Sequence, residues 1–167
     1  MRLVALLVLS ALAVGLVIGI AIGIDSSGFP PAGLEGTWVL KYYGEPGKLR
    51  MPYPWSEITL IINACATAEQ KIGGYPAREN VIAGSAGVNW YFGNYEVDGN
   101  KFITYTVIGE EKHIGSLVCT LVMGPAHLMA QEHHYRDILT SAQTYEITDG
   151  RLVISSGEEV LVFRWKG

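Results

Sequence analysis

Ser85 is the residue whose surroundings come closest to a catalytic motif. It lies in Ala83–Gly87 (AGSAG), which departs from the GxSxG turn of hydrolases only at its first position. That turn presents a nucleophilic serine between a strand and a helix. Here the strand-like run Trp90–Phe92 follows instead. The small residues therefore favour a close crossing of strands, and we predict no catalytic residue. A hydrolase that uses Ser85 is the alternative.

Three histidines could bind a metal ion. His127, His133 and His134 lie near Asp137 in one predicted helix, and His133 and Asp137 are one helical turn apart, a spacing that can begin a zinc site. Adjacent His133 and His134 point about 100° apart on a helix, so they do not converge on one ion. We therefore predict no metal and no cofactor, and we interpret these residues as solvated. The hydrolase alternative would use the same histidines.

Cys65 and Cys119 are the only two cysteines. Outside the cytoplasm a pair of thiols tends to be oxidised to a disulfide. A Cys65–Cys119 disulfide would close a long loop and stabilise the folded state by on the order of 4 kcal/mol. The other interpretation is two separate buried thiols that act as small apolar side chains. Sequence does not fix the distance between the two Cα atoms, so both interpretations stay open.

Residues 1–24 are predicted to be a membrane anchor or a signal segment. Leu3–Ile24 is a run of 22 residues without a charge, and as a helix it would span roughly 33 Å, enough to cross the hydrocarbon core of a bilayer. A cleaved signal has a shorter apolar region of about 7–15 residues. The length favours a retained anchor, whereas Ala21–Gly23 loosely imitates a cleavage site.

Charge sets the orientation and excludes some partners. Arg2 precedes the apolar run and the next basic residue is Lys41, so the positive-inside bias places residues 25–167 outside the cytoplasm. We predict a single-pass protein of the cell membrane or, after signal cleavage, a secreted one. Residues 25–167 hold 11 basic and 16 acidic side chains, a net charge of −5, without a basic cluster. This excludes nucleic acid and flat binding to anionic lipid.

Small residues recur at every fourth position of the apolar run. They are Ala11, Gly15, Gly19 and Gly23. On a helix they form one stripe, of the kind that lets two membrane helices approach closely. The stripe predicts a helix–helix contact and a homodimer. The alternative is that a run rich in alanine and glycine contains such a stripe by chance.

After a linker at residues 25–33, rich in serine, glycine and proline, one folded domain is predicted at residues 34–167. The expected strands are Thr37–Tyr43, Glu57–Asn63, two within Val81–Val97, those flanking the turns at Asp98-Gly99, Thr148–Arg151 and Ser155–Glu158, and Val160–Trp165. Apolar periodicity predicts one helix over Pro125–Ala142, with Gln131 and Glu132 toward solvent. The fold class is α+β, mainly antiparallel β: a small curved sheet or barrel with one helix, preceded by an N-terminal transmembrane helix.

Four segments resemble, in order, the META domain, the family of the HslJ-like heat-shock proteins. Leu34–Leu40 (LEGTWVL) is similar to its opening, and Leu128–Leu139, with Gln131 and Glu132, to its MxQExxYLxAL helix. The ending, from Tyr145 to Phe163, is similar too. The central motif GSAGCNxYFGxY is matched by Gly84, Ser85, Gly87, Asn89, Tyr91, Gly93 and Tyr95.

The resemblance implies a compact antiparallel domain with one helix, usually exported and often linked to envelope stress. It implies no established enzymatic activity and no agreed ligand. Val88 stands where the family usually has a cysteine, and the family often has a second cysteine just before the helix. The resemblance places Cys119 at that second position, with Cys65 taking over the role of the first. The segment Ala64–Asn80 resembles an insertion.

Tyr53 and Trp55 form the candidate binding surface. They lie in a proline-rich loop, PYPW, and loops carry function more often than the elements they connect. The alternative is a loop that caps one end of the core. We expect a non-enzymatic, membrane-anchored binding module with an envelope-stress role, whose partner is an envelope protein or surface component. The alternatives are an extracytoplasmic hydrolase and a structural module that dimerises through its membrane helix.

Overall fold

The computed structural model describes residues 33–63, 71–72, 75–76 and 80–167. The predicted membrane segment with its stripe of small residues, nearly all of the predicted linker, and Cys65 lie outside the described residues. Within the described ranges, no helix is long and apolar enough to cross a membrane. The anchor, the stripe and the Cys65–Cys119 bond therefore stay predictions.

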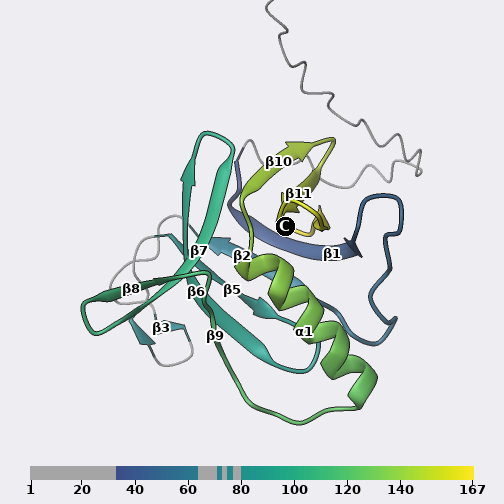
Figure 1. Cartoon of the computed structure of the whole chain (residues 1–167), viewed down its shortest axis with the longest axis horizontal. Helices are drawn as coiled ribbons and strands as arrows, with labels where there is room; N and C mark the ends of the chain where they lie inside the picture. Colours follow the sequence, from purple (N-terminus) through teal and green to yellow (C-terminus); the bar gives the residue numbers. More distant parts are fainter. Residues whose placement is uncertain (1–32, 64–70, 73–74, 77–79) are drawn as a thin grey trace, which may run out of the picture.

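Eight antiparallel strands close into a barrel, which Figure 1 shows with the single helix packed beside it. Around the wall the order is β7-β10-β11-β12-β1-β2-β5-β6, and β6 pairs again with β7. The strands are β1 Gly36–Gly44, β2 Thr59–Asn63, β5 Val81–Ser85, β6 Trp90–Asp98, β7 Lys101–Ile108, β10 Thr144–Thr148, β11 Arg151–Ser155 and β12 Val160–Trp165. The predicted α+β barrel with one helix is confirmed.

Positive backbone φ angles occur at the predicted hairpin turns. Asp149 and Gly150 have φ of 51° and 72° between β10 and β11, and Gly99 has φ of 60° between β6 and β7. Such angles suit the tight turns whose twist matches that of the flanking strands, and glycine adopts them at no steric cost. The turn residues therefore fix the register of these strand pairs.

Four short strands were not predicted. β8 (Glu111–Ile114) extends the sheet beyond β7, and β9 (Val118–Cys119) pairs with β6 through Tyr91 and Cys119. β3 (Lys71–Ile72) and β4 (Tyr75–Pro76) form a separate two-stranded sheet inside Ala64–Asn80, the segment interpreted as an insertion. Elements of two to four residues are too short for the alternation that identifies a strand in sequence.

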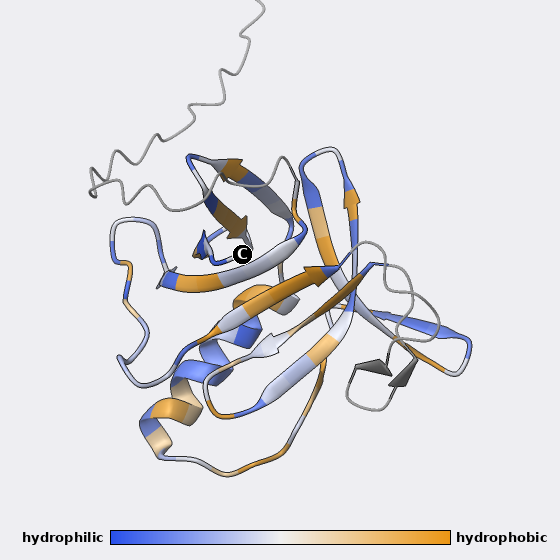
Figure 2. Ribbon diagram, turned by 180° about the vertical axis from the view of Figure 1, so that it is seen from behind, coloured by the Kyte–Doolittle hydropathy of each residue, from blue (hydrophilic) through white to orange (hydrophobic). Residues whose placement is uncertain are grey.

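The helix α1, Ala126–Thr140, lies within the predicted Pro125–Ala142, and Pro125 is its N-cap residue. Tyr135, Ile138 and Leu139 are buried against the barrel core. In Figure 2, β2 is largely hydrophobic, whereas α1 alternates hydrophobic and hydrophilic segments. The prediction that Gln131 and Glu132 face solvent is wrong, because both side chains are buried. They satisfy backbone groups of the β5–β6 turn and of the loop before β2, which periodicity alone does not reveal.

Candidate functional site

The buried carboxylate of Glu132 holds the β5–β6 turn against α1. Only 1% of the Glu132 surface is exposed. Its Oε2 accepts the backbone N–H groups of Asn89 at 2.8 Å and Val88 at 3.3 Å, and its Oε1 accepts Asn89 Nδ2 at 2.9 Å. Arg136 lies 3.8 Å from Oε1. A buried charge is tolerated when it is paired and hydrogen-bonded in this way, so Glu132 fastens the turn to the helix.

Asn89 carries the network on to the segment that follows β9. Its Nδ2 donates to the carbonyl of Val122 at 3.0 Å, and its Oδ1 accepts the N–H of Val122 at 2.7 Å. The Thr120 hydroxyl also donates to Asn89 Oδ1, at 2.8 Å. The Asn89 amide thus pairs with the backbone of Val122 as a neighbouring strand would. Thr120, which contributes its hydroxyl, and Val122, which contributes its backbone, were not found by sequence reasoning, because no motif marks either residue.

Gln131 fixes the proline-rich loop on the other side of the same turn. Its Oε1 accepts the N–H of Tyr53 at 2.8 Å, and its Nε2 donates to Ser56 Oγ at 2.8 Å. The Tyr53 ring packs edge-on against His127, with ring centroids 4.9 Å apart. The loop therefore has one defined position relative to α1, although it contains no regular structure.

The glycines of the central motif allow close approach of neighbouring backbone. A Cβ on Gly84 would overlap the carbonyl oxygen of Thr59, and a Cβ on Gly87 would overlap Ser56 Oγ. A Cβ on Gly93 would lie 2.7 Å from Leu117 Cδ2. The close strand crossing expected at Gly84 is confirmed.

The two motif tyrosines are buried in the barrel. Tyr91 donates its hydroxyl to the carbonyl of Thr59 at 2.8 Å, and the hydroxyls of Tyr91 and Tyr135 are 2.7 Å apart. Burial raises the pKa of the Tyr91 and Tyr135 phenols well above the usual value, so both stay protonated. Tyr95 stacks on Phe102 at 5.7 Å. The motif thus forms a rigid support between the barrel and the helix.

Ser85 does not lie in the context that a nucleophile elbow requires. It ends β5, and after a turn the chain enters β6 rather than a helix. Its hydroxyl accepts the N–H of Gly87 at 3.2 Å. His134 hydrogen-bonds Glu159 at 2.6 Å, and His133 lies 3.9 Å from Asp137. In the described part of the chain, none of these histidines hydrogen-bonds Ser85, and no three metal-ligating side chains are grouped.

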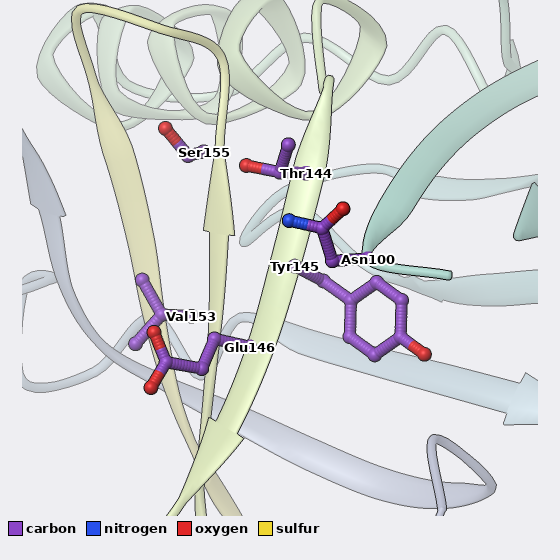
Figure 3. Close-up of a pocket in the computed structure, with 6 residues that line it drawn as sticks. All are labelled: Asn100, Thr144, Tyr145, Glu146, Val153 and Ser155. Carbon is purple, nitrogen blue, oxygen red and sulfur yellow. The ribbon is translucent and has the colours of Figure 1, made fainter. Parts of the chain in front are cut away.

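A shallow hollow lies on the barrel wall, along β10 and β11. Figure 3 shows its lining, which is Asn100, Thr144, Tyr145, Glu146, Val153 and Ser155. Its volume is about 300 Å³. Two of its polar side chains already have partners nearby: Glu146 accepts the Thr148 hydroxyl, and Ser155 accepts the N–H of Gly157. The hollow contains none of the candidate site residues, and we assign it no ligand.

Exposed apolar side chains gather on the segments that the motif holds in place. The proline-rich loop carries Met51, Tyr53 and Trp55, and the Trp55 side chain is 82% exposed. We call these three residues the Trp55 surface. Thr120–Met123, which we call the Leu121 edge, carries the second group, and Trp90 is exposed beside it. Sequence analysis identified Tyr53 and Trp55 but not Met51, Trp90 or Leu121.

Cys119 does not occupy the position that faces Val88. It pairs with Tyr91 across β9 and β6, and its side chain is half-buried. Burial raises the pKa of its thiol, and Arg136 partly offsets the effect. The residue that meets Val88 is Gly124, directly before Pro125, because a Cβ on Gly124 would lie 2.8 Å from Val88 Cγ2. The position just before the helix that contacts Val88 is therefore that of Gly124, and the expectation that Cys119 occupies it is corrected.

An eight-stranded antiparallel barrel with one helix held against it by a buried Asn–Glu network defines a small α+β barrel protein. The META domain family model matches residues 34–166, and the chain belongs to this family. Among solved structures, the NMR structure of a protein from Burkholderia xenovorans is similar, with a TM-score of 0.54 and 17% sequence identity. The match covers 87% of this chain and 99% of that one, and it shows a shared fold. No match was found among curated proteins.

Proposed function

We propose that this META-domain protein is a membrane-anchored, extracytoplasmic binding module without catalytic activity, and that it binds an envelope protein through the Trp55 surface. The observation that carries the proposal is an exposed tryptophan on an uncharged loop, Met51–Ser56, in an acidic domain. Exposed apolar surface of this kind is typical of interaction sites, and tryptophan is enriched among the residues that dominate binding energy.

The rigidity of the loop supports this proposal. Gln131 binds both Tyr53 and Ser56, so Trp55 lies between two anchored residues. A side chain that is already positioned loses less conformational entropy when a partner binds. The anchoring part of the proposal depends on the uncharged run Leu3–Ile24 and the charge asymmetry around it, and the stress role depends on the resemblance to the family.

The test is photo-crosslinking in intact cells with the full-length protein. A photoreactive phenylalanine analogue replaces Trp55 in one strain and Ile108 in another, because Ile108 is also exposed but lies on β7. We expect a specific adduct with another envelope protein from position 55 only. Identical adducts from both positions, or adducts with the protein itself alone, would contradict the proposal. Tyr53 is a poorer probe because its ring packs against His127.

The stress role has its own test. Deletion of the gene is expected to reduce survival in envelope-damaging detergent, and the full-length gene is expected to restore it. A complementing copy with Trp55→Ser should fail to restore survival, whereas one with Ile108→Ser should succeed. Equal survival of the deletion and parent strains would contradict the stress role and leave the binding proposal to the crosslinking result.

A further inference from the structure

The two terminal strands of the main sheet differ in how they are protected from pairing with another molecule. β8 ends the sheet on one side, and all four of its residues are exposed, with Glu111 and Lys112 among them. Charged side chains on an edge strand oppose edge-to-edge association. β9 ends the sheet on the other side, and no Asp, Glu, Lys or Arg occurs from Ile114 to Gln131. This edge lacks the protection that β8 has.

The hydrogen bonding of β9 to β6 continues into the Leu121 edge, as in an extended chain. The N–H of Thr120 donates to the carbonyl of Trp90 at 2.9 Å, and Val122 exchanges two hydrogen bonds with the Asn89 amide. Alternate residues of an extended chain direct their backbone groups to opposite sides. Leu121 and Met123 therefore present their N–H and C=O groups away from the barrel. No described residue accepts a hydrogen bond from either N–H.

These outward groups are accessible. Leu121 is 93% exposed and Met123 is 86% exposed. Figure 1 shows the connection from β9 to α1 at the periphery of the molecule, along the lower side of the view. Unpaired backbone groups in an extended, solvent-exposed segment are a template for one more strand.

We propose that the Leu121 edge pairs with the Leu121 edge of a second copy of this protein, as antiparallel strands related by a two-fold axis. A two-fold contact places each surface patch against itself, so a charged segment would meet like charge. The Leu121 edge has no charge, whereas residues 25–167 carry a net charge of −5. It is therefore a surface on which two acidic domains can meet without like-charge repulsion. Trp55 is not part of this edge and stays free for another partner.

Disulfide trapping tests the pairing, because a contact of a few residues is small and its association is expected to be weak. Full-length protein in intact cells carries Cys65→Ser and Cys119→Ser, and then either Leu121→Cys or Val122→Cys. Directly opposite residues of antiparallel strands have Cβ atoms about 4.5–5.5 Å apart, so oxidation should yield a covalent dimer at one of these positions. Trp55→Cys and Ile108→Cys serve as exposed controls away from the edge.

We expect dimer from Leu121→Cys or Val122→Cys, and only background from the two controls. Absence of dimer at both edge positions would overturn the proposal. Equal dimer at all four positions would overturn it too, because that result indicates random encounter or association through another part of the chain. Neither result bears on the Trp55 surface, whose test is the adduct with another protein.

A second pair of variants separates backbone pairing from apolar contact. With Val122→Cys as the reporter, Leu121→Pro removes the outward N–H and the leucine side chain, whereas Leu121→Thr removes only the side chain. We expect loss of the dimer with proline and its retention with threonine, because strand pairing needs the N–H. If Leu121→Cys is the position that gives dimer, it is the reporter, and Met123→Pro is compared with Met123→Thr in the same way. Equal dimer with proline and threonine would overturn the strand-pairing geometry. Unchanged thermal unfolding shows that both variants fold.

Discussion

Replacing Val88 and Gly124 by cysteine is expected to create a disulfide that stabilises the domain. A Cβ on Gly124 would lie 3.5 Å from the Cβ of Val88, which is within the range found in disulfides. Gly124 does not have a positive φ, so cysteine is compatible with its backbone. Removal of the valine methyl groups also relieves the overlap that a side chain at position 124 would otherwise meet.

The magnitude follows from the loop that the bond closes. Positions 88 and 124 enclose roughly 35 residues, for which the chain-entropy model gives about 4 kcal/mol. The bond would join the β5–β6 turn to the residue before Pro125, two segments that the Asn89 network already connects. Little native strain is therefore expected, and most of the calculated stabilisation should be observed.

The assay compares the oxidised and reduced forms of one protein. The double variant is made with Cys65→Ser and Cys119→Ser, and its free energy of unfolding is measured in urea with and without a reductant. We expect the oxidised form to be more stable and mass spectrometry to show no free thiol. The single variant Gly124→Cys, which retains Val88, should be destabilised by overlap. Free thiols under oxidising conditions, or a less stable oxidised form, would refute the described contact between positions 88 and 124.

Three further predictions concern buried contacts, each measured as the free energy of unfolding in urea. Glu132→Ala should cost about 3 kcal/mol because the buried N–H donors of Asn89 lose their acceptor. Glu132→Gln should cost less, and equal losses would contradict a hydrogen-bonding role. Gly84→Ala should cost about 2 kcal/mol by overlap with Thr59, and an unchanged midpoint would refute this. The raised folded pKa of Tyr135 means that its contribution is complete below the unfolded pKa of 10.0 and is lost as pH rises above it, so Tyr135→Phe should flatten that decline by up to about 1.4 kcal/mol per pH unit.

Local signals in the sequence predicted most of the barrel. The Asp-Gly pair at positions 98 and 99 and the turn at Asp149-Gly150 end strands because they favour positive φ. The apolar run Val160–Trp165, which follows the turn at Ser155–Glu158, predicted β12 with the bounds that the structure has. β8 and β9 could not be predicted in the same way, because so few residues contain no recognisable period.

The candidate site was only partly predictable. Tyr53 and Trp55 were identified from their place in a proline-rich loop, and both are exposed. Gln131 and Glu132 were expected in solvent, since a polar residue beside an apolar helical stripe usually lies there. Their burial depends on backbone donors that come from other parts of the chain, those of Tyr53 and Asn89. No pattern within the helix contains that information.

The sequence by itself determined the family, the strand-rich fold and the position of the helix, because propensity, turn chemistry and hydrophobic period are local properties. It also carries the charge pattern on which the membrane-anchor prediction depends. Only the tertiary structure decided that Asn89 and Glu132 join three distant segments, and that Gly124 rather than Cys119 meets Val88. Only it revealed that no described residue pairs with the outward side of the Leu121 edge. These are contacts between residues far apart in sequence, and they exist only once the barrel has closed.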